Sequence, residues 1–226
     1  MPRKIQSAEP TGDPSADVRA TSPERQSSID KANAILDAAA SVFMEIGFAA
    51  ASVDDISEAY GATKGIIYYH FRNKSALFFA VQRRAMEMTR AAIEPHAVAD
   101  NPAPQRLRDM AYAHTMLMMH QLSYLRVAAQ GLELHLSGRT SAKERAELQS
   151  ITDLRDGNEQ LYVKVIEAGV QSGAFRKVDP KLSVKPLLGA LNWTSRWYRP
   201  RPNETEADRR KIADEVSSFA VQAFLP

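Results

Sequence analysis

Cationic and hydrogen-bonding side chains gather between residues 61 and 78, where the sequence reads GATKGIIYYHFRNKSALF. The stretch has two adjacent tyrosines, a histidine, an arginine and two lysines, and it contains no acidic residue. Hydroxyl groups, ring N–H groups and cationic side chains are the donors that proteins direct at phosphate oxygens. A catalytic histidine would usually have a carboxylate or a nucleophile beside it. This stretch therefore favours contact with a phosphate backbone over catalysis.

The distribution of charge supports the same interpretation. The formal net charge of the chain is only +2, which by itself does not indicate nucleic acid. Between residues 61 and 92, however, the cations face a single acid, Glu87, whereas residues 30–58 carry mainly acids. A protein that is nearly neutral overall can still have one strongly positive face. We expect such a face near residues 64–74.

Composition limits the other classes of protein. The chain has 226 residues, 44% of them apolar, which is enough for a sizeable core. It has no cysteine, so disulfides, thiolate nucleophiles and cysteine-ligated metals are excluded. No run approaches the roughly 18 to 20 apolar residues of a membrane helix, and the first residues do not resemble a signal peptide. We therefore expect a cytoplasmic protein without a membrane partner.

Apolar residues three or four positions apart predict helices along the chain, and no segment has the pattern of a strand. Gly47 ends the first predicted helix, Ser52 caps the second and Gly61 ends it, and Thr63 caps a third that runs to about Phe71. We expect a fourth helix from residue 73 or 74, followed by helices near residues 105–120, 122–137, 142–171, 180–198 and 204–224. The predicted fold class is all-α. The second and third helices, joined by a tight turn, fit a helix-turn-helix whose second helix enters a DNA major groove.

Residues 30–78 resemble the DNA-binding domain of the TetR family of transcriptional repressors. The matching positions are Gly47, Ser52, Val53, Asp55, Ile56, Gly61, Lys64, Gly65, Tyr68, His70, Phe71 and Lys74. The resemblance implies a homodimer that binds a double-stranded DNA operator. Residues 64–67 would then face the groove, and phosphate contacts would come from the start of the second helix and from Tyr68, Tyr69, His70 and Lys74. The full predicted DNA-binding set is Ser52, Val53, Thr63, Lys64, Gly65, Ile66, Ile67, Tyr68, Tyr69, His70 and Lys74.

The domain organisation follows from these patterns and from the resemblance. Residues 1–28 are rich in Pro, Ser, Ala and Thr and poor in large apolar groups, so we predict a disordered N-terminal arm. Residues 29–78 form the predicted helix-turn-helix domain, and residues 79–226 the helical ligand-binding and dimerisation domain. Ile66 stands where the family often has Thr or Ser, so an apolar contact, for example with a thymine methyl group, would replace a hydroxyl contact there.

A methionine-rich run, MAYAHTMLMMHQLSYL from residue 110, is the first candidate for a ligand site. Flexible thioether side chains suit an adaptable apolar cavity, and a histidine within the same stripe would supply a polar group. The same pattern also fits an ordinary core, and the sequence leaves both interpretations open. The predicted ligand-binding residues are Met110, His114, Met118 and Tyr124 in this run and Leu188, Leu191, Asn192 and Ser195 further along the chain.

The segment VKPLLGALNWTSRWYRP, from residue 184, has two distinct apolar faces. Gly189, Trp193 and Trp197 share one face, which we predict to pack across a two-fold axis as the dimer interface. The segment also resembles TetR-like regulators of acyl-CoA, steroid or fatty-acid catabolism. That resemblance implies an acyl-CoA effector, with Arg196 and Arg199 as candidate phosphate contacts, although surface ion pairs are an alternative role for both.

Catalytic motifs are absent from the sequence. There is no HExxH, GxSxG, Walker loop or GxGxxG, and the histidines show no metal-binding spacing, so we expect no catalytic residue, no metal and no cofactor. The leading hypothesis is a TetR-type repressor that a small hydrophobic effector, an acyl-CoA or an aromatic compound, releases from a palindromic operator. The alternatives are a DNA-binding protein that acts through protein partners without a ligand, or a sensor of a small free aromatic compound.

Overall fold

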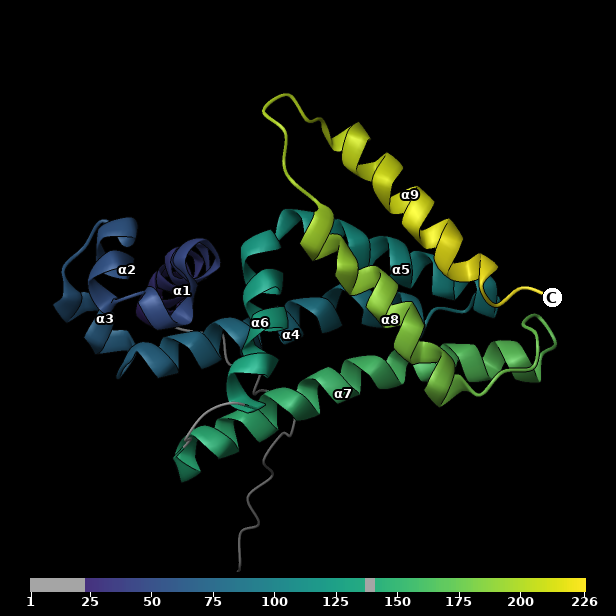
Figure 1. Cartoon of the computed structure of the whole chain (residues 1–226), viewed down its shortest axis with the longest axis horizontal. Helices are drawn as coiled ribbons and strands as arrows, with labels where there is room; N and C mark the ends of the chain where they lie inside the picture. The colour runs from purple at the N-terminus through teal and green to yellow at the C-terminus, as the bar shows by residue number, and fades with distance from the viewer. Residues whose placement is uncertain (1–22, 137–140) are drawn as a thin grey trace, which may run out of the picture.

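The computed structural model describes residues 23–136 and 141–226, and every regular element within them is an α-helix (Figure 1). This confirms the predicted all-α class. The helices are α1 Pro23–Ala50, α2 Val53–Tyr60, α3 Lys64–His70, α4 Lys74–Ala97, α5 Ala103–His120, α6 Leu122–Leu136, α7 Ala142–Gln171, α8 Pro180–Trp197 and α9 Glu206–Gln222.

Local signals set the ends of the first helices. Gly47 has a φ of 79° and interrupts the regular geometry of α1, a backbone conformation that glycine adopts without strain. Ser52 caps α2: its hydroxyl accepts from the Asp55 N–H, and the Asp55 carboxylate accepts from the Ser52 N–H. Gly61, with a φ of 77°, ends α2. The Asn73 side chain caps α4 by accepting from the Ala76 N–H.

One predicted boundary needs correction. Of the predicted disordered arm at residues 1–28, residues 1–22 lie outside the described residues, but residues 23–28 belong to α1. The helix therefore begins about two turns earlier than its apolar pattern, because its first turns are polar and exposed and give no periodic signal. The other predicted helices are observed with bounds shifted by one or two residues.

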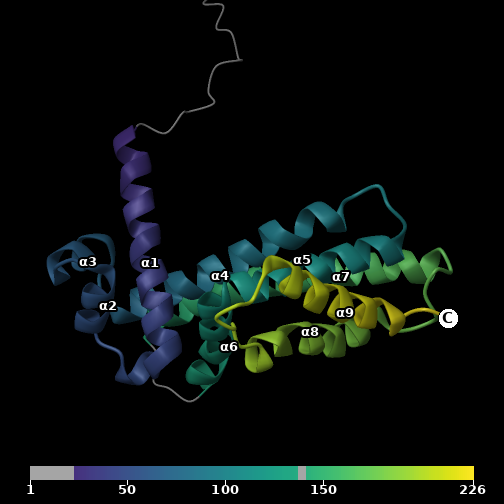
Figure 2. The ribbon, with the colours of Figure 1, turned by 90° about the horizontal axis from the view of Figure 1, so that it is seen from above.

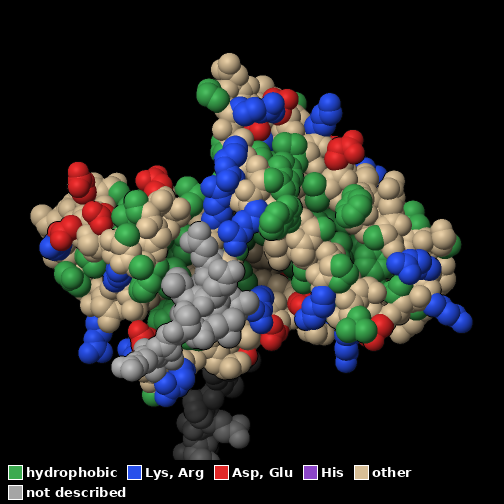
Figure 3. Space-filling view, viewed as in Figure 1, with side chains coloured by type: hydrophobic (Ala, Val, Ile, Leu, Met, Phe, Trp, Pro, Cys, Tyr) green, Lys and Arg blue, Asp and Glu red, His purple; other side chains and the backbone are tan. Residues whose placement is uncertain are grey.

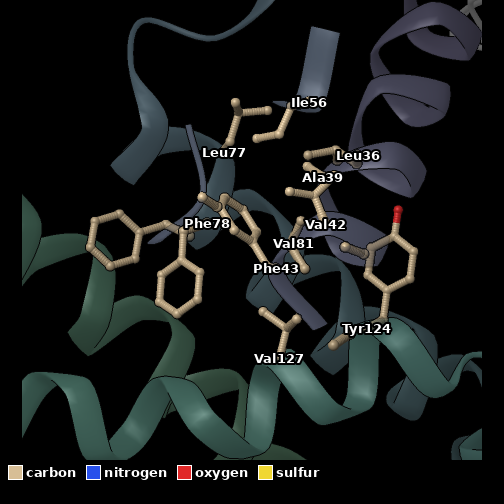
Figure 4. Packing of buried hydrophobic residues seen from close by; sticks show 14 of the residues in the cluster. Leu36, Ala39, Val42, Phe43, Ile56, Leu77, Phe78, Val81, Tyr124 and Val127 are labelled. Atoms are coloured by element: carbon tan, nitrogen blue, oxygen red, sulfur yellow. The ribbon is translucent and has the colours of Figure 1, made fainter. Parts of the chain in front are cut away.

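A compact apolar core holds α1, α2 and α3 against the start of α4, and buried residues of α5, α6 and α7 complete it (Figure 4). Ile35, Ile56, Ile67 and Leu77 have no exposed surface, and Phe43 has almost none. The rings of Phe43 and Phe78 meet edge to face, with centroids 5.5 Å apart. By length and composition residues 25–50 could also cross a membrane, which is weak evidence for one helix, and Ile35, Leu36 and Phe43 of this segment are buried in this core.

α4 leaves this core and runs into a larger helical body built from α5 to α9 (Figures 1 and 2). A second apolar core fills the far end of that body, with Leu107, Tyr162 and Ile166 fully buried. Gly169 lets α7 lie close to the following turn, because a Cβ there would come within 2.0 Å of the Phe175 ring. The two parts of the molecule thus share one continuous helix.

Candidate DNA-binding surface and effector cavity

α3 presents an exposed face that intramolecular packing does not explain. Tyr69 is 83% exposed, Tyr68 50% and Ile66 43%, although large apolar and aromatic side chains are usually buried. Thr63, Lys64 and Gly65 precede them and are also exposed. Hydroxyl groups, an ammonium group and an unscreened backbone therefore lie together on one short helix, the arrangement that major-groove and phosphate contact requires.

Two predicted DNA-binding residues at this helix have other surroundings. Ile67 is fully buried in the core beneath α3, which corrects the expectation that it faces the groove. Ile66 and Tyr68, its two neighbours in the chain, are exposed, so Ile67 lies on the inner side of the helix. His70 is half-buried, and its ring meets the Tyr69 ring edge to face, with centroids 5.0 Å apart. Ser52 and Val53 are half-buried at the start of α2.

Lys64 remains available at the surface. Its ammonium lies 2.6 Å from the Asp54 carboxylate in α2, and both side chains are at least half exposed. Such an exposed pair contributes little to stability, and a phosphate can compete for the lysine. Asp54 also places a negative charge beside α3.

Lys74 has a structural role that the sequence did not reveal. Its ammonium donates to the carbonyl oxygens of Phe48 at 2.7 Å, Ala49 at 3.3 Å and Ala51 at 2.7 Å. It also lies 4.6 Å from the centroid of the Phe48 ring. These contacts use the three N–H donors of the ammonium group to cap the end of α1. A phosphate contact by Lys74 stays a prediction, and it would have to displace one of these carbonyls.

A cavity of about 250 Å³ lies within the larger body, between α4, α5, α6, α7 and α8. Its wall is largely apolar, which suits a small hydrophobic molecule. The side chains that line it are Gln82, Met86, Thr89, Ile93, His114, Met118, Leu125, Ala128, Ala129, Leu148, Ile151, Thr152, Arg155, Asn158, Glu159, Tyr162, Leu188, Asn192 and Ser195.

Five of the eight predicted ligand-binding residues line this cavity: His114, Met118, Leu188, Asn192 and Ser195. Three do not, which corrects those predictions. Met110 and Leu191 are fully buried in the second core, and Tyr124 packs in the first. The sequence analysis missed the contributions of α4 and α7, because their lining residues lie in long amphipathic helices whose pattern is that of any core.

His114 and Tyr162 form a buried polar pair at the cavity wall. The Nδ1 atom of His114 lies 3.1 Å from the Tyr162 hydroxyl, which also lies 3.3 Å from the Met110 carbonyl oxygen. Burial lowers the pKa of His114 to about 4, so the imidazole is neutral at pH 7. If the Tyr162 hydroxyl donates to the Met110 carbonyl oxygen, it accepts a hydrogen bond from the N–H at Nδ1 of His114. Nε2 of His114 then carries no proton and is an acceptor.

The charged residues of the cavity wall are Arg155 and Glu159, both on α7. Arg155 is exposed and pairs with Asp156 at 3.0 Å, and Glu159 pairs with Lys185 of α8 at 2.6 Å. Arg196 and Arg199, the candidate phosphate contacts, are not among the lining residues. Arg199 instead donates to the carbonyl oxygens of Arg196 and Tyr198 at the end of α8.

Tyr124 connects the two parts of the molecule. Its hydroxyl donates to the Asp37 carboxylate of α1 at 2.7 Å, and Figure 4 shows the ring at the edge of the core with its hydroxyl toward that helix. Arg84 of α4 lies 3.8 Å from the same carboxylate and 5.4 Å from the tyrosine ring. Burial, and then the bond to Asp37, raise the pKa of Tyr124. The next residue, Leu125, lines the cavity.

Arg126, one residue further along α6, makes a second connection. Its guanidinium donates to the carbonyl oxygens of Ser195 and Tyr198 at 2.8 Å each, and its Nη1 atom lies 3.8 Å from the Met44 sulfur of α1. α6 therefore contacts α1 on one side and the end of α8 on the other. Ser195, one of its partners, is a cavity residue.

α8 and α9 carry an exposed apolar face, seen as the green side chains gathered over these helices in Figure 3. Trp193 is 63% exposed, Trp197 46%, and Phe219 of α9 63%. A Cβ added at Gly189 would have no neighbouring atom within 4 Å, so the glycine leaves open space beside the tryptophans. Large exposed aromatic side chains on adjacent helices are typical of a protein interface.

Comparisons with known proteins agree with this geometry. The family model described as "Bacterial regulatory proteins, tetR family" matches residues 35–81, and the model described as "Tetracyclin repressor-like, C-terminal domain" matches residues 100–224. The second match alone spans more than half of the 226-residue chain. The chain belongs to the TetR family. It is a TetR-type transcriptional repressor and not an enzyme.

Individual relatives and solved structures are similar to this chain at low sequence identity. The HTH-type transcriptional repressor KstR2 of Rhodococcus jostii (strain RHA1) is 25% identical over 175 residues, covering 74% of this chain and 78% of that protein. The TetR-family regulator PfmR of Thermus thermophilus has a similar structure, with a TM-score of 0.71 and 28% identity over 83% of this chain and 97% of that one. AibR, solved with isovaleryl coenzyme A and operator DNA, shares the fold with a TM-score of 0.68 and 21% identity, covering 87% of this chain and 98% of that one.

Proposed function

We propose that the protein works as a homodimer that binds a palindromic operator and leaves it when a small hydrophobic effector occupies the cavity. The observation that carries this proposal is the dual role of α4. Near its start, Leu77 and Val81 are buried in the core of the helix-turn-helix domain. The next residue, Gln82, lines the cavity, and so does Met86 about one turn later. A ligand that moves this helix necessarily moves the domain packed against it.

The thermodynamic requirement is modest. The dimer has one conformation in which the spacing of its two α3 helices fits DNA and another in which it does not. An effector shifts the equilibrium only if it binds the second conformation more tightly than the first. Tyr124, Asp37 and Arg84 supply a polar contact between the two parts, and Leu125 and Arg126 tie it to the cavity wall and to α8. We propose that a bound ligand acts by changing the arrangement of this network.

For the effector we propose an apolar molecule, and an acyl-CoA thioester as the first class to test. The support is the apolar wall, the exposed Arg155 in that wall, and the fold shared with AibR, which binds isovaleryl coenzyme A. A phosphate-bearing ligand would use Arg155 in place of the Arg196 and Arg199 contacts that the sequence suggested. A small free aromatic compound is the alternative, since about 250 Å³ accommodates one without any opening to solvent.

Dimerisation is proposed through α8 and α9. Trp193, Trp197 and Phe219 would be covered by the same surface of a second copy, as a two-fold axis requires. A dimer would present two α3 helices to two half-sites of an operator. A ligand-free regulator acting through protein partners is less well supported, because the cavity is open space and not filled core.

The test is an operator titration with and without candidate effectors. The purified chain should bind DNA from its own promoter region at low salt, and an acyl-CoA or an aromatic compound should lower that affinity while raising the melting temperature of the protein. A compound that stabilises the protein without weakening operator binding would contradict the proposed switch.

A further inference from the structure

The cavity wall contains buried polar atoms that have no hydrogen-bond partner in the part of the chain that the structure describes. The Nε2 atom of Gln82 and the Oδ1 atom of Asn158 are both buried and unpaired. The two side chains are 4% and 6% exposed, and both line the cavity. Leaving such a group unpaired is unfavourable, so an unpaired donor and an unpaired acceptor at one cavity need an explanation.

The orientation of the Asn158 amide is fixed. Its Nδ2 atom donates to the Met86 carbonyl oxygen at 2.9 Å, and a carbonyl can only accept. The unpaired atom is therefore the acceptor, Oδ1. Neutral His114, 3% exposed in the same wall, offers a second acceptor through Nε2 when Nδ1 donates to Tyr162. Both acceptors call for a hydroxyl or N–H donor on the ligand.

Gln82 has the complementary need. Its unpaired Nε2 atom is a donor, which calls for a carbonyl-type acceptor on the ligand. The charged members of the wall, Arg155 and Glu159, are each paired with a neighbour, so an ionised group of a ligand would have to displace an existing ion pair to reach Arg155. Transfer of a bare carboxylate into such a cavity is strongly unfavourable.

Resting on the proposed role of the cavity as the effector site, we infer that the effector buries an uncharged polar group with both an O–H or N–H donor and a carbonyl-type acceptor. The donor pairs with Asn158, the acceptor pairs with Gln82, and the apolar body contacts the methionine and leucine side chains of the wall. Free carboxylates, which at neutral pH only accept hydrogen bonds, are excluded as tight ligands.

The experiment compares four probes of one chain length: octanamide, N,N-dimethyloctanamide, methyl octanoate and octanoate. Each is titrated into the full chain by calorimetry at pH 7.5. Octanamide should bind about two- to tenfold more tightly than the dimethylamide and the ester, which lack a donor, and octanoate should bind least tightly. Octanoate binding as tightly as octanamide, or equal binding of the amide and the dimethylamide, would overturn the inference.

Variants assign the two contacts. Asn158→Leu should abolish the preference for octanamide over the ester, whereas Gln82→Leu should weaken both ligands and leave their ratio nearly unchanged. Gln149→Leu is the control, since its amide is exposed on α7, bonds Asp153 at 2.8 Å and lies outside the cavity wall. If Asn158→Leu does not fold, the amide and dimethylamide comparison on the natural chain still decides.

Different experimental results would contradict the inference and the proposed function. Failure of all four probes to bind, with operator binding intact, would overturn the inference about the buried polar group. The proposed function would then be judged by the operator titration, in which these probes have no part. Operator binding that no ligand affects would contradict the switch, whatever the probes show.

Discussion

The candidate DNA-binding surface and the candidate effector cavity are built in opposite ways. The surface is one exposed side of a seven-residue helix, and its position depends on caps and glycines within about thirty residues. The cavity is lined by five helices, with lining residues that extend from Gln82 to Ser195. The surface therefore depends on local sequence, whereas the cavity depends on how distant helices pack, and substitutions should affect the two regions differently.

The largest effect is expected from a substitution on the proposed dimer face of α8, which leaves α3 unchanged. Trp193→Asp should weaken dimerisation by about 3 kcal/mol or more, because a charge would replace a large apolar anchor. Operator affinity should fall with it, although no residue of α3 has changed. Analytical ultracentrifugation and operator titration measure both. Val98→Asp is the matched control, since Val98 is 71% exposed but follows α4; dimeric Trp193→Asp protein would show that α8 is not the interface.

The two lysines of the helix-turn-helix domain should respond in opposite ways. Lys74→Ala removes the cap on three carbonyl groups and should lower the free energy of unfolding by about 2–3 kcal/mol. Lys64→Ala should change stability by less than about 0.5 kcal/mol but should weaken operator binding and reduce its salt slope by about one. Chemical denaturation and a salt series distinguish them. If the Lys74→Ala variant is well folded and its operator affinity depends less on salt, Lys74 would be supported as a phosphate contact.

His114 should make the larger body sensitive to acid. Burial lowers its pKa from 6.5 to about 4, so the unfolded chain takes up a proton at a pH where the folded chain does not. The contribution to stability is complete above pH 6.5 and is lost as the pH falls towards 4; between pH 7.5 and 5 the loss is about 2 kcal/mol. Denaturation of the natural chain and of His114→Gln at both pH values tests this. Equal pH dependence in the two proteins would contradict it.

The smallest effect concerns the contact between the two regions. Tyr124→Phe keeps the ring in the core but removes the bond to Asp37, and should cost about 1 kcal/mol of stability. Effector binding should be nearly unchanged, because Tyr124 is not a cavity residue, whereas the effect of effector on operator affinity should decrease. The coupling is obtained from operator titrations with and without effector. Unchanged coupling would assign signal transmission to other contacts.

The sequence predicted the fold class, the Ser52 cap of α2 and the exposed face of α3, because these depend on neighbouring residues. Thr63 stands at the predicted N-cap position of α3, but its side chain makes no capping hydrogen bond. It did not predict that Lys74 caps α1 or that Ile67 faces inward, since both depend on how α1, α3 and α4 pack. In the larger body, His114, Asn192 and Ser195 were found because a polar residue interrupts an apolar stripe. Gln82 and Asn158 were missed because nothing in a single helix shows which of its polar residues will be buried without a partner.

The contacts of α6 with α1 limit how this protein can be recombined with its relatives. A hybrid that joined residues 23–78 to another effector domain would keep the covalent connection into α4. It would lose the contacts that Asp37 and Met44 make with Tyr124, Arg84 and Arg126, all of which lie beyond that junction. We expect such a hybrid to bind the operator yet to respond poorly to its new effector. A functional exchange of domains would therefore have to carry the matching surface of α1 along with α6.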